Sequence, residues 1–83
     1  MIKITATLLR VYSLLSLDWK VLSELVAESG LARATFQYNL SHLLAAGLVE
    51  RSQTRPASYR LATVLDDEAE LIRQRIEQAK TVF

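Results

Sequence analysis

The fold of this chain is decided by residues 24–49, which read ELVAESGLARATFQYNLSHLLAAGLV. Apolar residues recur at helical spacing before Gly30, and again between Gly30 and Gly47. A glycine directly after a helical run is typical of a helix end, because without a Cβ it adopts the left-handed conformation at little cost. The stretch therefore predicts two consecutive helices, over residues 20–29 and 33–46.

The flanking segments extend this pattern in both directions. Residues 4–17 are apolar at helical spacing and on more than one face, which predicts a helix buried on two sides. After Gly47 the apolar residues alternate instead, and a polar turn with a proline divides residues 48–61 into two strand-like runs, so a β-hairpin is expected. A cluster of acids then opens a last predicted helix over residues 66–82.

Length and composition set the fold class. A chain of 83 residues has room for one core, so residues 1–83 are expected to form a single domain. Its hydrophobic fraction of 51%, with only two glycines and one proline, excludes a disordered chain. The expected fold is mainly α-helical with a small β-hairpin.

Several kinds of chemistry are excluded by what the sequence lacks. Without cysteine there can be no disulfide or thiolate site, and His42 is the only histidine, so neither a metal nor a cofactor is expected. The absence of a nucleophile–base pair and of a glycine-rich phosphate loop predicts that the protein is not an enzyme. No apolar run suits a membrane span and the first residues lack a signal-peptide pattern, so the cytoplasm is the expected compartment.

Charge is unevenly distributed along the chain. The net charge is only +1, but residues 30–62 carry four arginines against the single acid Glu50. Residues 63–83 carry more acids than bases. The middle third is therefore the basic part, and an anion is its expected partner.

Four short motifs add a resemblance to a known family: ELVAESGL at 24–31, TFQYNLSHL at 35–43, AGLV at 46–49 and YRL at 59–61. In this order and spacing they resemble the winged helix-turn-helix superfamily of bacterial regulators, such as the MarR and ArsR types and the short regulators of fimbrial operons. The chain departs from the family pattern at Val26, where a small alanine is usual, and at Ala32 and Ala34, where serine is common.

The resemblance implies a winged helix-turn-helix domain with an N-terminal helix and a C-terminal dimerisation helix. Residues 20–29 and 33–46 would form the helix-turn-helix, with 33–46 as the recognition helix, and the hairpin over 48–61 would be the wing. The implied function is sequence-specific binding of double-stranded DNA by a small transcriptional regulator.

The predicted recognition helix turns Phe36, Leu40 and Leu43 inward, which leaves its other face for DNA. In the major groove arginine pairs with guanine edges and glutamine with adenine edges, whereas wing arginines contact phosphates. The candidate DNA-binding residues are Arg33, Thr35, Gln37, Tyr38, Ser41, Arg51, Arg55 and Arg60. Two alternatives stay open: these side chains form an ordinary solvated surface, or Arg60 pairs across the hairpin with Glu50.

The last predicted helix carries a narrow apolar seam that repeats at alternating steps of four and three. This pattern is typical of a helix that faces another helix, so we expect a homodimer held by the N- and C-terminal helices, with the last helices antiparallel. The expected interface comprises Leu9, Leu65, Ala69, Ile72, Ile76, Ala79 and Phe83. The alternative is a monomer whose last helix folds back over its own first helix.

A second function remains open beside DNA binding. Winged helices also serve as protein-binding modules, and the charge here is modest, so the domain could instead dock on a larger regulator or machine. Trp19, between two predicted helices, is expected to fill the core or an interface rather than to stack on a base.

Overall fold

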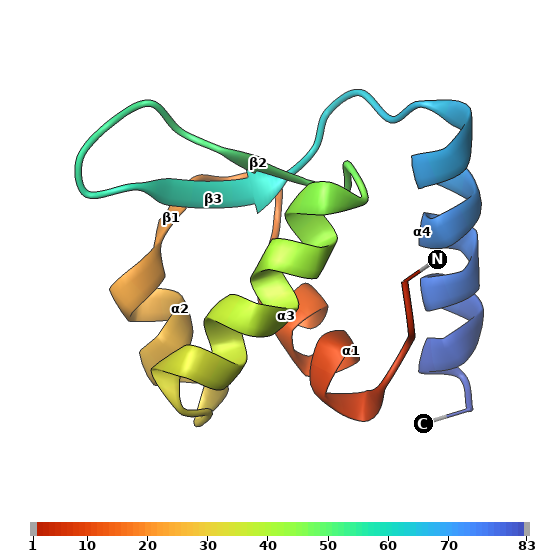
Figure 1. The fold of residues 1–83 in the computed structure, drawn as a ribbon, viewed down its shortest axis with the longest axis horizontal. Coiled ribbons are helices and arrows are strands. Elements are labelled where there is room, and N and C mark those ends of the chain that lie inside the picture. The colour runs from red at the N-terminus through yellow and green to blue at the C-terminus, as the bar shows by residue number, and fades with distance from the viewer. Residues whose placement is uncertain (1, 83) are drawn as a thin grey trace.

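The computed structural model describes residues 2–82 and has a mixed α and β architecture (Figure 1). Across these residues the elements are α1 (Ala6–Ser13), β1 (Lys20–Val21), α2 (Leu22–Ser29), α3 (Arg33–Ala45), β2 (Val49–Arg51), β3 (Ser58–Leu61) and α4 (Asp67–Lys80). The three strands form an antiparallel sheet in the order β1-β3-β2. The domain is therefore a small α-plus-β fold, with its helices on one side of the sheet and α4 at one end (Figure 1).

The helix ends follow the local signals in the sequence. Gly30 and Gly47 both have positive φ, at 71° and 79°, where a side chain would be strained. Asp66 caps the start of α4, because its side chain accepts a hydrogen bond of 2.7 Å from the backbone N–H of Ala69. The predicted limits of α3, the hairpin and α4 are thus confirmed to within a few residues.

The region between α1 and α2 differs from the prediction. The first helix was expected to run to residue 17 but ends at Ser13, and Lys20 and Val21 form strand β1 rather than the start of a helix. β1 pairs with β3, where Lys20 lies opposite Tyr59, and the carbonyl of Ser16 accepts a 2.7 Å hydrogen bond from the N–H of Leu61. The segment between α1 and α2 is therefore hydrogen-bonded to a distant part of the chain.

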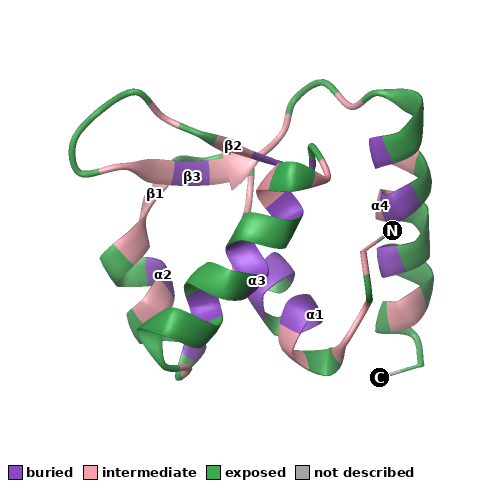
Figure 2. Cartoon of the chain, in the orientation of Figure 1, coloured by how far each residue is buried: buried purple, intermediate pink, exposed green. Residues whose placement is uncertain are grey.

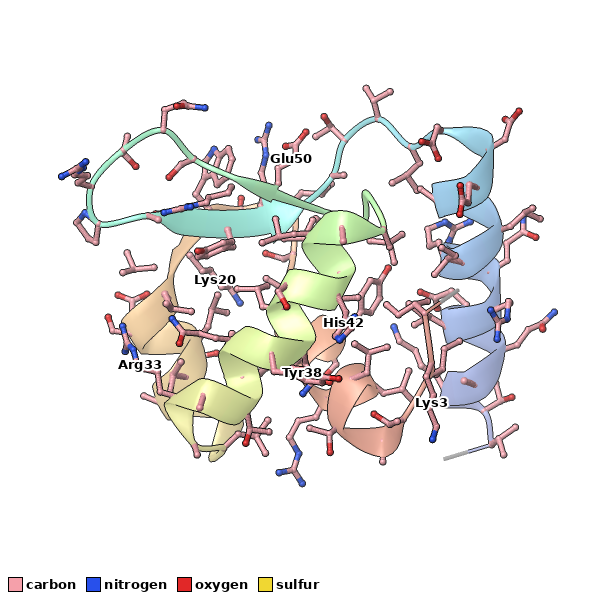
Figure 3. All side chains as sticks on the ribbon, viewed as in Figure 1. Lys3, Lys20, Arg33, Tyr38, His42 and Glu50 are labelled. Carbon is pink, nitrogen blue, oxygen red and sulfur yellow. The ribbon has the colours of Figure 1, made fainter. Side chains whose placement is uncertain are left out.

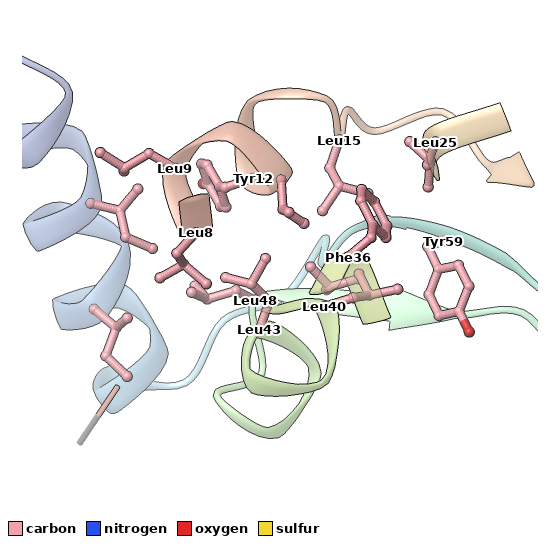
Figure 4. Packing of buried hydrophobic residues seen from close by; sticks show 14 of the residues in the cluster. Leu8, Leu9, Tyr12, Leu15, Leu25, Phe36, Leu40, Leu43, Leu48 and Tyr59 are labelled. Carbon is pink, nitrogen blue, oxygen red and sulfur yellow. The ribbon is translucent and has the colours of Figure 1, made fainter. Parts of the chain in front are cut away.

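The core lies between the sheet and the helices, with α1 between α3 and α4 (Figures 1 and 4). Its most deeply buried side chains include Leu8, Val11, Leu25, Phe36, Leu43 and Ile76. Four of the eight residues of α1 are buried, which agrees with a first helix covered on two sides. No helix within residues 2–82 is long and apolar enough to cross a membrane.

The apolar seam of α4 belongs to this same core. Ala69, Ile72 and Ile76 are at most 6% exposed in the single chain, and Figure 2 shows the buried positions of α4 on the side that faces α1. In Figure 4 side chains from α4 point toward Leu8 and Leu9 of α1. The stripe that was predicted to face a second chain is therefore packed in the core of its own chain, and the homodimer itself stays a prediction.

The remaining residues of that predicted interface fit the same conclusion. Leu9 is 8% exposed, and Leu65 and Ala79 are half-buried against the core. Phe83 lies outside the described residues. The alternative arrangement, in which the last helix covers the first helix of its own chain, matches the structure.

Candidate functional site

Helix α3 has one buried and one exposed face. Its buried face consists of Phe36, Asn39, Leu40 and Leu43, which pack into the core. The predicted DNA-contacting residues of this helix, Arg33, Thr35, Gln37, Tyr38 and Ser41, are all exposed. Helical periodicity explains this division, because residues three and four apart share a face.

The exposed face of α3 combines a cation, an amide and an aromatic ring. Arg33 takes part in no ion pair within residues 2–82. Tyr38 is 66% exposed, and its ring lies edge-on to His42 with 4.6 Å between the ring centroids. The Ser41 hydroxyl donates to the carbonyl of Tyr38 at 2.7 Å, so its donor is used within the helix and only its acceptor capacity faces outward.

The β2–β3 hairpin carries two further exposed arginines, Arg51 and Arg55, and neither forms an ion pair within the described part of the chain. Its turn is held by Ser52, whose N–H donates to the Ser58 carbonyl and whose hydroxyl accepts from the Ser58 N–H, both at 2.8 Å. A polar hollow of about 310 Å³ opens at this turn, lined by residues 51–55. Arginine and hydroxyl groups together suit an anion.

Arg60, by contrast, is occupied by other residues of the sheet. Its Nε donates to Oε2 of Glu50 at 2.7 Å, and its guanidinium lies 4.3 Å from the ring centroid of Trp19. The hydrogen bond from Arg60 holds the pKa of Glu50 below its usual range. The alternative in which Arg60 pairs with Glu50 is therefore the one that the structure has, and Arg60 leaves the candidate DNA-binding set.

The two regions that keep their candidate residues lie on the same side of the domain. Arg33 is the first residue of α3, and in Figure 3 this end of the helix and the hairpin turn both lie toward the left of the view. Glu50 and Arg60 pair on the sheet face that points away from the core, since Val49 and Tyr59 of the same strands point inward. Trp19 shares that outward face and is 44% exposed, so it does not fill the core, and its role in an interface stays a prediction.

Two polar residues near α3 were missed by reasoning from the sequence. Asn39 is only 8% exposed, and its Nδ2 donates to the carbonyl of Thr35 at 2.9 Å. Its position three residues after Phe36 was the available signal, because that spacing belongs to the buried stripe. Lys3 lies with Tyr38 and His42 around one pocket, and nothing local to residue 3 indicates this.

Metal binding finds no support in the geometry. Among the described residues no group of three or more histidine, cysteine, aspartate or glutamate side chains is placed to hold an ion.

Comparison of the chain with models of known protein families, with curated proteins and with solved structures finds no match.

Proposed function

We propose that the protein binds double-stranded DNA sequence-specifically, as a small transcriptional regulator of the winged helix-turn-helix type. Helix α3 enters the major groove in this proposal, and the β2–β3 hairpin contacts the sugar–phosphate backbone. The observation that carries it is the exposed face of α3, where Arg33, Gln37 and Tyr38 stand together without an acidic partner in the described residues.

The fold supports this proposal in two ways. The order of elements, with α2 and α3 joined at Gly30 and followed by a hairpin, fits the helix-turn-helix and wing that the sequence resembles. Helix α3 has 13 residues and is thus about 20 Å long, and a major groove about 12 Å wide admits a single helix. Its buried face is held by the core, so its exposed face is presented rigidly.

The side-chain chemistry supports a division of labour between the two regions. Arg33 and Gln37 match guanine and adenine edges, so they would read sequence. Arg51 and Arg55 would meet phosphates, which position a protein on the duplex but carry no sequence information. Nothing in this arrangement supports a catalytic role, and we propose a binding protein rather than an enzyme.

The test is the binding of duplex DNA across a range of salt concentrations, measured by fluorescence anisotropy with a random sequence. Arg51 and Arg55, which form no ion pair within the described residues, predict a slope of log K against log salt of about −2 if each meets one phosphate. Selection from a pool of random duplexes should then enrich a common motif. A protein that binds no duplex at low salt, or binds it with a slope near zero, contradicts the proposal.

A second candidate function is docking on a larger protein, and one observation favours it. Leu17 and Trp19 are 62% and 44% exposed in the segment that leads into β1. Large apolar side chains at a surface are enriched at protein interfaces. The double variant Leu17→Ser, Trp19→Ser separates the two functions, since it should leave duplex binding unchanged if α3 and the hairpin are the DNA-binding elements.

A further inference from the structure

A pocket of about 230 Å³ lies between the N-terminal segment and the outer side of α3. Its described lining residues are Ile2, Lys3, Thr5, Leu8, Tyr38, Asn39 and His42. The segment before α1 supplies one wall and α3 supplies the opposite one, where Tyr38 and His42 stand one helical turn apart (Figure 3). The pocket is thus built from two parts of the chain that the fold brings together.

The lining of this pocket combines a lysine with aliphatic side chains. Lys3 is an exposed lysine at its edge, and no acidic side chain is among the described lining residues. Lys3 forms no ion pair within residues 2–82. Ile2 and Leu8 add aliphatic surface. A cation beside aliphatic surface suits a molecule with an anionic group and an apolar body.

Asn39 adds a more specific requirement. Its Nδ2 is used by the carbonyl of Thr35, and its Oδ1 has no hydrogen-bond partner among the described residues. Among the described residues, every fully buried side-chain oxygen or nitrogen has a hydrogen-bond partner. Since Oδ1 of Asn39 has none, this oxygen is not fully buried, even though Asn39 is only 8% exposed. The pocket that Asn39 lines is where that acceptor can meet a donor.

We propose that this pocket binds a small organic acid that carries a hydroxyl or amino group beside its carboxylate and has a short branched aliphatic body. The carboxylate pairs with Lys3, the hydroxyl or amino group donates to Oδ1 of Asn39, and the aliphatic part lies against Ile2 and Leu8. The volume sets the size: a cavity of about 150 Å³ holds benzene and drug-sized ligands need roughly 300 Å³ or more, so 230 Å³ suits a small metabolite.

A DNA phosphate is the competing occupant for the same cation, and the shape of the site argues against it. Phosphate contacts are made at open, positively charged surfaces by side chains that reach outward. Here the cation borders a recess with aliphatic walls and a buried amide, features that a phosphate group would leave unused.

The position of Tyr38 couples this site to the proposed DNA surface. Tyr38 lines the pocket and is also one of the residues proposed to enter the major groove. A bound anion would place negative charge beside the DNA and would restrict the Tyr38 ring, so it should weaken duplex binding. This coupling rests on the proposed function, whereas binding of the acid does not.

The test measures acid binding without DNA, by calorimetry and by amide NMR shifts of the full chain. The probes are α-hydroxyisocaproate, isocaproate, which lacks the hydroxyl donor, and α-hydroxyisocaproamide, which lacks the charge. We expect the hydroxy acid to bind most tightly, with shifts centred on Lys3, Asn39 and His42. Lys3→Gln should weaken its binding by about tenfold, the size of one charge-assisted hydrogen bond, while Arg10→Gln on the exposed side of α1 should not.

Two results would overturn the proposal. Equal binding of the acid and the amide would remove the role of Lys3, and absence of any shift at high-millimolar probe would remove the site. A Lys3→Gln variant that binds no less acid but shows a shallower salt slope with duplex DNA would identify Lys3 as a phosphate contact instead. If the acid binds as expected but does not change the affinity for duplex DNA, the binding site is confirmed and the proposed coupling to DNA is wrong.

Discussion

Helices α3 and α4 both bury an apolar stripe in the same core, but their outer faces differ. On α4 charged side chains pair within the helix, where Glu70 pairs with Arg73 and Glu77 with Lys80. On α3 the outer face presents Arg33 with Gln37 and Tyr38, and no acidic side chain of the described residues forms an ion pair with Arg33. A stripe shows that a helix is covered, whereas an unbalanced outer face indicates where a partner of opposite charge would bind.

The largest expected effect is on stability and tests the buried apolar stripe of α4. Ile76→Ala should lower the free energy of unfolding by about 2–5 kcal/mol, because Ile76 is fully buried and its loss leaves a cavity. The matched control is Leu71→Ala on the same helix, which is 62% exposed and should change stability by no more than about 0.5 kcal/mol. Urea unfolding followed by circular dichroism measures both.

Protein concentration makes this experiment decisive for the seam of α4. In a chain that covers its own seam, the midpoint of unfolding of the wild type and of Ile76→Ala does not depend on protein concentration. A midpoint that rises with concentration in the wild type, and no longer does so in Ile76→Ala, would show that the seam faces a second chain after all.

The outer face of α3 should show the next largest effect. We expect Arg33→Ala to cost about 1–3 kcal/mol in binding to the selected DNA motif and to relax the preference at one base pair, because a bidentate contact to a base edge is lost. Arg10→Ala on α1 is the control, as an exposed cation on a different helix. Equal losses on selected and random duplexes would reassign Arg33 to a phosphate.

A smaller effect separates the two arginines of the hairpin region that the structure treats differently. Arg55→Ala should weaken binding to all sequences alike and lower the salt slope by roughly one unit, since one phosphate contact is removed. Arg60→Ala should leave the slope unchanged, because its guanidinium is bound to Glu50. Anisotropy titrations at several salt concentrations measure both, and identical slopes for the two variants would contradict this assignment.

The smallest expected effect concerns α1 and appears only at alkaline pH. Burial, with a lesser contribution from Glu77, raises the pKa of Tyr12 above its ordinary value. The unfolded chain therefore loses this proton first, so the stabilisation is complete below the ordinary tyrosine pKa and is lost as pH rises through the folded value. Tyr12→Phe should show a shallower fall in unfolding free energy with rising pH, and equal slopes for both proteins would be the contrary result.

Much of the fold could be predicted from signals that act over a few residues. Helix ends at Gly30 and Gly47 follow from backbone conformation, the start of α4 follows from the Asp66 cap, and the exposed face of α3 follows from helical periodicity. These signals need no knowledge of where the rest of the chain lies. For the same reason the candidate residues of α3 are exposed as the sequence predicted.

The rest was decided by contacts between residues far apart in the chain. Strand β1 exists because Lys20 and Val21 meet β3, and the Leu61 N–H bonds the Ser16 carbonyl just beyond the end of α1. The sequence determined that the seam of α4 is covered, but the fold decided that the core of the same chain covers it, because an apolar stripe has the same pattern whichever helix it faces. Likewise the sequence placed an arginine at position 60, and strand register decided that Glu50 rather than an outside anion would hold it.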